Sequence, residues 1–226
     1  MNTVNTVVFS DVHLGSPMSR AFDLLQTLKE YHFKKLVILG DMFEDMNFMY
    51  LTSTHWELLE HIGKVSRRGV EVVWVEGNHD GKFCDFISLL LGIGVHKEYI
   101  WQVGNRRFIG LHGHQFDSFL TNNKIIGPLL AKLYAVFQRR VSSHLFDYLM
   151  NKFSDRWLRL SEQISKKAIE HAELKKCDVV VCGHTHVVYN VKHNNVEYFN
   201  IGCWNNKPSY LLIIEESGKA YYKVVA

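Results

Sequence analysis

Five short polar clusters, each preceded by a run of apolar residues, constrain this chain more than any other feature of its sequence. The apolar runs are rich in β-branched and aromatic residues and predict buried strands, so each cluster lies in the turn at a strand's carboxyl end. Active sites of open α/β sheets lie at that end. We therefore expect the clusters to converge on one edge of one sheet. They are Asp11-Val12-His13, Gly40-Asp41, Gly77-Asn78-His79-Asp80, His112-Gly113-His114 and Gly183-His184-Thr185-His186.

The spacing of the clusters indicates the class of fold. Steps of 30, 37 and 34 residues lead from Asp11 through Asp41 and Asn78 to His112, and each is about one β-α-β unit. This alternation predicts an α/β protein with parallel strands and right-handed crossovers. Strands are expected at residues 5–10, 35–39, 70–75, 98–103, 106–111, 179–182, 187–192, 196–201, 210–214 and 220–225, and helices at 17–31, 51–68 and 83–91.

A longer step separates the last two clusters. His112 and His184 are 72 residues apart, which indicates an insertion at about residues 118–176. Apolar residues recur there at helical spacing, so we expect two or three helices within a single domain of residues 1–226.

The basic charge of the chain is local. Residues 118–176 hold 11 Lys and Arg against 5 Asp and Glu, whereas the rest of the chain holds 15 against 18. The insertion is therefore basic and the remainder slightly acidic. Such a surplus fits a binding surface, or only the solvated face of an ordinary helical hairpin.

Composition indicates a reduced, non-secreted globular protein. With 226 residues and 47% hydrophobic content, the chain can bury a substantial core. No apolar run reaches the ~18 residues that span a bilayer, and the N-terminus enters a strand at once, so we expect a cytoplasmic protein. The four cysteines have no Cys-x-x-Cys spacing and are expected to be reduced thiols: Cys84, Cys177, Cys182 and Cys203.

The clusters carry ligands for hard and borderline metal ions. Aspartate, asparagine and histidine suit Mn²⁺, Fe²⁺ or Zn²⁺, and cysteine, which soft metals prefer, is absent from the clusters. Seven such ligands are too many for one ion and about right for two. A bridging carboxylate would hold two cations ~3.5–4 Å apart, and Asp41 is the candidate.

In order and spacing, these motifs resemble the calcineurin-like metallophosphoesterases over residues 7–202. The resemblance implies a four-layer α/β/β/α sandwich of two sheets flanked by helices. It also implies two divalent ions, Mn²⁺ before Fe²⁺ or Zn²⁺, bridged by Asp41. One ion would be held by Asp11, His13 and His186, and the other by Asn78, His112 and His184.

Other residues of the clusters suggest catalytic and substrate contacts. His79 is expected to stabilise the phosphate or protonate the leaving oxygen, with Asp80 orienting its ring, although His79 could instead be an ordinary turn residue. His114 is a candidate for a substrate or outer-shell contact, because it lies two residues after His112. Lys166 and Lys167, near the return from the insertion, are candidates for phosphate contacts.

Within the superfamily, the chain is similar to the UDP-2,3-diacylglucosamine pyrophosphatases. The resemblance lies in Phe9-Ser10-Asp11-Val12-His13-Leu14-Gly15, in Leu39-Gly40-Asp41-Met42-Phe43-Glu44, and in Leu111-His112-Gly113-His114-Gln115-Phe116-Asp117 followed by the insertion. It implies hydrolysis of the pyrophosphate of an acylated nucleotide sugar to UMP and a lipid sugar phosphate. The sequence departs from better known members, which have arginine where His79 stands and aspartate where His114 stands.

Two further functions stay open. A phosphodiesterase or nuclease would share every metal ligand, but it should have a basic groove on the sheet body, and here the body is net acidic, so nucleic acid is not an expected partner. A non-catalytic scaffold should have lost ligands, and none is missing.

The insertion is expected to form a lid. Both of its ends join metal-bearing strand ends, so we expect it to rise over the metals and to hold acyl chains against its large apolar residues. Its basic residues suit an anionic membrane surface at ~1 kcal/mol each, which would place the protein at the inner membrane face.

Overall fold

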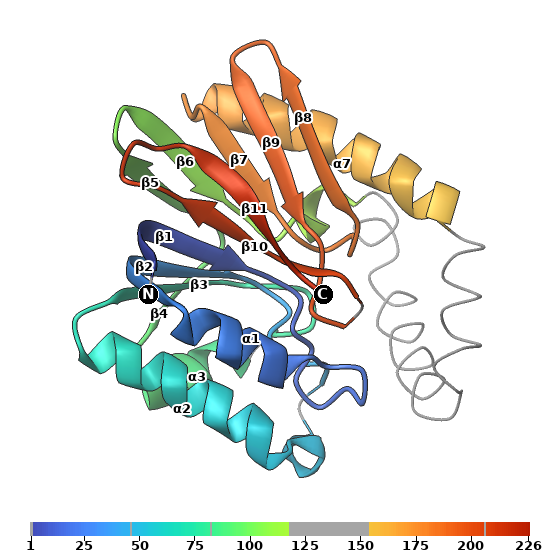
Figure 1. Cartoon of the computed structure of the whole chain (residues 1–226). Coiled ribbons are helices and arrows are strands. Elements are labelled where there is room, and N and C mark those ends of the chain that lie inside the picture. The colour runs from blue at the N-terminus through green and yellow to red at the C-terminus, as the bar shows by residue number, and fades with distance from the viewer. Residues whose placement is uncertain (1, 46, 82, 118–153, 206) are drawn as a thin grey trace.

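The computed structural model describes residues 2–45, 47–81, 83–117, 154–205 and 207–226. Two β-sheets pack face to face, and helices cover the outer face of each (Figure 1). The predicted four-layer α/β/β/α sandwich is confirmed.

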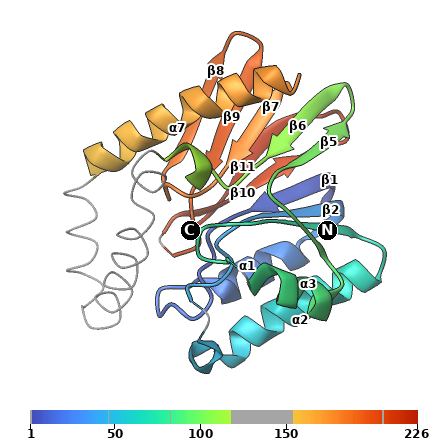
Figure 2. The ribbon, with the colours of Figure 1, turned by 180° about the vertical axis from the view of Figure 1, so that it is seen from behind.

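The first sheet has the strand order β11-β10-β1-β2-β3-β4. Strands β1 to β4 are parallel, as the predicted β-α-β alternation requires, and β10 adds to β1 in the antiparallel sense. Helices α1, α2 and α3 cover the outer face of this sheet (Figure 2). The elements are β1 (Asn2–Phe9), α1 (Ala21–Lys29), β2 (Tyr31–Leu39), α2 (Ser53–Arg67), β3 (Glu71–Val75), α3 (Phe83–Leu91), β4 (Gly94–His96), β10 (Ser209–Ile214) and β11 (Ala220–Val225).

The second sheet has the strand order β5-β6-β7-β9-β8. Strands β6, β7 and β9 are parallel, whereas β5 and β8 pair with β6 and β9 in antiparallel hairpins. Its strands are β5 (Tyr99–Val103), β6 (Arg106–Gly110), β7 (Val179–Cys182), β8 (Val188–His193) and β9 (Val196–Ile201). The described residues also form the short 3₁₀ helices η1 (Phe48–Tyr50) and η2 (His114–Phe116).

Three apolar clusters fill the spaces between the four layers. The outer face of the first sheet packs against α1 and α2 through buried residues such as Leu24 and Trp74. The two sheets bury residues such as Val37 and Phe199 between them. The second sheet packs against α7 (Ser154–Leu174) through residues such as Ala168. Inner strands such as β7 and β10 are apolar and buried on both faces, because other layers cover both faces of each sheet.

The presence of two sheets corrects one expectation. The polar clusters do not converge on one edge of one sheet: Asp11, Asp41 and Asn78 follow strands of the first sheet, and His112 and His184 follow strands of the second. Because the sheets pack face to face, both sets of strand ends meet at one end of the sandwich. The sequence pattern reveals strand ends but not which strands pair.

Part of the predicted lid belongs to the sandwich itself. Helix α7 lies along the second sheet and contacts β7, β8, β9 and η2 (Figure 1). This stretch therefore forms the fourth layer. The rest of the predicted insertion, residues 118–153, lies outside the described residues.

Two further expectations concern cysteines and the membrane. All four cysteines are buried and in the thiol form, as predicted. Among the helices that the structure describes, none is both long and apolar enough to cross a bilayer.

Candidate metal centre

The turns that carry the candidate site have an unusual backbone. Five of the predicted ligands have positive φ, with values from 48° to 72°. Such conformations cost about 1–3 kcal/mol each in residues other than glycine, and they cluster at functional sites because the surrounding structure has to hold them. These residues are Asp11, His13, Asp41, His184 and His186.

Asp11, His13 and His186 form one group. Asp11 Oδ1 lies 3.2 Å from His186 Nε2 and 3.8 Å from His13 Nε2, and the two Nε2 atoms are 3.1 Å apart. The other carboxylate oxygen of Asp11 accepts from the Ser10 hydroxyl and from the His184 backbone N–H. Three ligand atoms from β1 and β7 turns thus face one point.

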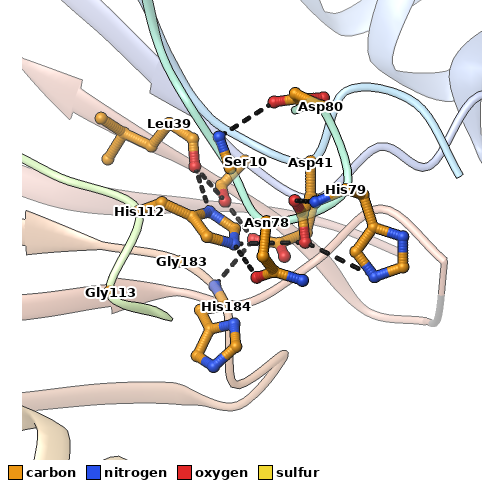
Figure 3. Close-up of polar contacts among 12 residues, drawn as sticks. Ser10, Leu39, Asp41, Asn78, His79, Asp80, His112, Gly113, Gly183 and His184 are labelled. Atoms are coloured by element: carbon orange, nitrogen blue, oxygen red, sulfur yellow. Dashed lines mark hydrogen bonds and ion pairs between the residues drawn. The ribbon is translucent and has the colours of Figure 1, made fainter. Parts of the chain in front are cut away.

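Asn78, His112 and His184 form a second group beside the first. His112 Nε2 lies 3.2 Å from Asn78 Oδ1 and 3.2 Å from Asp41 Oδ2 (Figure 3). The rings of His112 and His184 have centroids 5.3 Å apart. Ligand atoms of Asp11, Asp41 and His112 all lie within 4.8 Å of one another, so Asp41 stands where the two groups meet. The structure therefore brings all seven predicted ligands together.

Hydrogen bonds fix the rings of the second group. The Nδ1 atom of His112 lies 2.7 Å from the Leu39 carbonyl oxygen, so Nδ1 donates and Nε2 faces Asp41. His184 Nε2 lies 3.1 Å from Asp117 Oδ2, which leaves Nδ1 as the ring atom that would bind a metal. Such outer partners set which ring nitrogen is available to a cation.

The charges of the cluster favour a cation. Burial alone would raise the pKa values of Asp11 and Asp41, but nearby histidines, His112 foremost, hold both pKa values below the usual range of a carboxyl group. Burial alone would lower the pKa of His112, but Asp41 and Asp11 raise it to about 9. The buried carboxylates are therefore charged and stabilise positive charge beside them.

These residues fit divalent cations. Asp11 Oδ1 is buried and accepts no hydrogen bond from the described residues. The Nε2 atoms of His13 and His186 face each other, and Asp11 Oδ1 is the acceptor that they share. This arrangement is unfavourable for two imidazoles alone but suits ligands placed around a cation. Oxygen and imidazole nitrogen ligands suit Mn²⁺, Fe²⁺ and Zn²⁺ alike, so the donor set does not select one metal.

His79 lies beside this group, and its ring is not oriented by Asp80. The backbone N–H of His79 donates to Asp41 Oδ1 at 2.8 Å, and the ring atom Nδ1 lies 2.8 Å from the Glu44 carbonyl oxygen. The ring atom Nε2 lies 4.0 Å from Asp41 Oδ2. The expectation that Asp80 orients this ring is wrong, because the Glu44 carbonyl holds it.

Asp80 instead joins the turns after β2 and β3. Its carboxylate accepts from the backbone N–H groups of Met42, Phe43 and Gly77 and from Trp74 Nε1, at distances between 2.9 and 3.4 Å. Burial, and then the charge of Asp41, raises its pKa to about 6. Asp80 therefore fixes the backbone that carries Asp41 and Asn78.

The predicted substrate contacts differ in their surroundings. His114 is partly buried, its ring centroid lies 5.4 Å from that of His112, and burial followed by the charge of His112 lowers its pKa to about 4. Lys166 and Lys167 are exposed on α7, and Lys167 Nζ donates to the Phe116 carbonyl oxygen at 3.2 Å. His114 thus borders the candidate metal centre, whereas Lys167 joins α7 to η2.

Two carboxylates of the site were missed from the sequence. Glu44 Oε2 lies 2.9 Å from His13 Nδ1, and Asp117 pairs with His184. Both lie in stretches that carry the family resemblance. Each is a charged residue next to an apolar one, and this local pattern could have identified them as candidates. Their partners are 31 and 67 positions away in the sequence, so no local pattern links them.

A calcineurin-like phosphoesterase superfamily domain model matches residues 4–216 of the chain. The fold, the cluster of ligands and this match define a metallophosphoesterase, a hydrolase that uses divalent metal ions. The chain belongs to the calcineurin-like phosphoesterase superfamily.

The individual proteins that resemble this chain have low sequence identity to it. The chain is 22% identical to a UDP-2,3-diacylglucosamine hydrolase of Blochmanniella pennsylvanica (strain BPEN), over 95% of this chain and 94% of that protein. An archaeal phosphodiesterase has the same fold, with a TM-score of 0.54, 13% identity and coverage of 97% and 98%. Yfce, a phosphoesterase from E. coli, matches with a TM-score of 0.51, 16% identity and coverage of 98% and 99%. At these identities the two structures show the fold alone.

Proposed function

We propose that this chain hydrolyses the pyrophosphate of an acylated nucleotide sugar similar to UDP-2,3-diacylglucosamine, releasing UMP and a lipid sugar phosphate. The observation that carries this proposal is the similarity to a UDP-2,3-diacylglucosamine hydrolase over nearly the whole length of both chains. The reaction would belong to lipid A biosynthesis.

The metals would be held by the two groups of ligands. Asp11, His13 and His186 would hold one cation, Asn78, His112 and His184 the other, and Asp41 would bridge them. Two divalent cations at such a site, Mn²⁺ before Fe²⁺ or Zn²⁺, supply a nucleophile from water near neutral pH and neutralise charge on the phosphoryl oxygens.

His79 would act as the proton donor. Its Nδ1 atom faces the Glu44 carbonyl oxygen, so Nε2 is the ring atom that can deliver a proton to the leaving oxygen. The hydrogen bond from its backbone N–H to Asp41 ties this acid to the bridging carboxylate. His114, on the side of His112 and His184, would contact the substrate.

Residues 118–153 and the exposed lysines of α7 would recognise the lipid. In sequence, this segment combines large apolar residues, among them Leu133, Phe137 and Phe146, with Arg139 and Arg140. Apolar side chains would hold acyl chains, and basic residues together with Lys166 would face the pyrophosphate and an anionic membrane surface. The protein would then work at the cytoplasmic face of the inner membrane.

A substrate panel tests this proposal. Purified protein, stripped of metal and reloaded with Mn²⁺, is given UDP-2,3-diacylglucosamine, an unacylated nucleotide sugar, bis(p-nitrophenyl) phosphate, single-stranded DNA and RNA. We expect the acylated nucleotide sugar to be cleaved fastest and the metal-free protein to be inactive. Preferred cleavage of DNA or RNA would overturn the lipid assignment and favour a nuclease.

A further inference from the structure

Glu44 contacts two residues of the site through two different groups. Its carboxylate oxygen Oε2 lies 2.9 Å from His13 Nδ1, and its carbonyl oxygen lies 2.8 Å from His79 Nδ1. We propose that Glu44 is a positioning residue that aims His13 at the metal with its side chain and aims His79 at the substrate with its backbone. This inference rests on the metal-dependent function proposed above.

The fold places Glu44 beside His13 by extending a strand pair past the end of the sheet. The His13 N–H donates to the Asp41 carbonyl at 3.1 Å, the Leu14 N–H to the Met42 carbonyl at 2.8 Å, and the Glu44 N–H to the Leu14 carbonyl at 3.0 Å. Leu14 and Phe43 form a parallel bridge. The turns after β1 and β2 therefore run side by side, which fixes the backbone of Glu44 against that of His13.

The Glu44 carboxylate lies on the Nδ1 side of the His13 ring, where ligand atoms of Glu44, His13 and His79 all lie within 4.8 Å of one another. It faces Nδ1, whereas the opposite ring atom, Nε2, faces Asp11 and His186. A carboxylate at ion-pair distance from Nδ1 favours a proton on that atom, which would leave Nε2 to bind a cation. Glu44 is 6% exposed, so water has little access to take its place.

The carbonyl group gives His79 the same kind of support. Since Nδ1 of His79 donates to the Glu44 carbonyl, Nε2 is turned toward Asp41, 4.0 Å away. The rings of His13 and His79 meet edge to face with centroids 5.0 Å apart. One residue of the β2 turn thus sets the distance between a metal ligand and the proposed acid.

The two roles predict separable effects, because substitution removes the carboxylate and keeps the carbonyl. Glu44→Ala should weaken Mn²⁺ binding by about 10–100-fold, the usual effect of removing an outer partner of a ligand histidine. Glu44→Gln keeps an oxygen in the same place and should restore most of the affinity. Glu44→Asp keeps the charge but withdraws the oxygen by one methylene, so it should resemble Glu44→Ala.

The experiment is a Mn²⁺ titration of metal-free protein by calorimetry for the wild type, the three Glu44 variants and a control. Glu216→Gln is the control, because Glu216 is an exposed glutamate that pairs with Lys34. Circular dichroism of the metal-free proteins monitors folding. Glu44→Asp provides the test if Glu44→Ala does not fold. If Glu44 had only a structural role, its variants would lower the melting temperature. Their Mn²⁺ affinities would then not fall in the order wild type, Glu44→Gln, and last Glu44→Asp and Glu44→Ala.

The backbone half of the proposal has its own measurement. In Mn²⁺-saturated Glu44→Gln, rates for aryl phosphodiesters of different leaving groups should depend on leaving-group pKa as in the wild type, because His79 keeps its carbonyl partner. A different dependence of the rate on leaving-group pKa would contradict the proposed role of the Glu44 carbonyl.

Other outcomes would overturn the proposed role of the Glu44 side chain or the metal-dependent function on which it rests. Equal Mn²⁺ affinity of wild type and Glu44→Ala ends the positioning role of the side chain. An equal loss in Glu44→Gln and Glu44→Ala would make the carboxylate a direct ligand, which also contradicts the proposal. A wild-type protein that binds no Mn²⁺, Fe²⁺ or Zn²⁺ would instead remove the proposed metal-dependent function.

Discussion

Asp41 stands where the two groups of predicted ligands meet. Its Oδ2 atom lies 3.2 Å from His112 Nε2, and its Oδ1 atom accepts from the His79 N–H. Asp41→Ala would remove the anion that we propose to lie between two cations, so activity should be abolished and metal content should fall from about two ions per chain toward one or none. Elemental analysis of the purified proteins measures this, with Glu216→Gln as control. A fully loaded, fully active Asp41→Ala protein would exclude Asp41 as the bridge.

His79 differs from the seven predicted ligands because its ring nitrogen Nδ1 already faces a carbonyl oxygen. His79→Ala should slow turnover by roughly 10²–10⁴-fold, the usual contribution of a general acid, and should leave both metals bound. Steady-state rates and metal content of the same preparation provide the measurement.

The leaving group separates two roles of His79. A substrate with an acidic leaving group needs no proton donor, so it should partly rescue His79→Ala. Absence of rescue would indicate phosphate binding, and loss of metal would make His79 a ligand.

At the scale of elements, the turns after β2 and β3 approach so closely that only glycine fits at position 77. An added Cβ at Gly77 would lie 2.2 Å from Asp41 Oδ1 and 2.3 Å from Asp41 N. Gly77→Ala should therefore displace Asp41, weaken metal binding by about tenfold or more and lower the free energy of unfolding by about 1–3 kcal/mol. Urea unfolding of the metal-free protein and Mn²⁺ titration measure the two effects.

Gly63→Ala is the matched control for this substitution. Gly63 lies inside α2, and an added Cβ there would meet the flexible end of Arg67 at 3.2 Å. Because alanine favours a helix interior by about 1 kcal/mol over glycine, this variant should keep or slightly gain stability and should keep its metals. Equal behaviour of the two variants would contradict the close approach at Gly77.

At the scale of the whole molecule, the described residues outside 118–153 already form three apolar clusters between the layers. Replacing residues 118–153 by a glycine-serine linker should therefore keep the fold, the metals and hydrolysis of bis(p-nitrophenyl) phosphate. Activity on the acylated nucleotide sugar and binding to anionic liposomes should be lost. Circular dichroism, rate measurements and liposome sedimentation test this, and equal losses on small and acylated substrates would mean that the segment only supports the fold.

The sequence by itself determined the elements and the chemistry at their ends. Apolar periodicity and turn residues are local signals, so most strands and helices lie within a few residues of their predicted bounds, and α3 at Phe83–Leu91 matches fully. Helix α1 begins at Ala21 and not at residue 17, because the Ser19 hydroxyl and the Arg20 N–H bond to the carbonyls of Val12 and Trp204. The seven predicted ligands followed from strand-end clusters and the family resemblance.

Tertiary structure decided how those elements meet. Strand β1 pairs with β2 next along the chain and with β10 near its end, and periodicity carries no information on partners. The division into two sheets, the place of α7 as the fourth layer, and the contacts of Glu44 and Asp117 with His13 and His184 all depend on packing between distant segments. The sequence names the groups of the site, but layer packing and strand register set the distances between them.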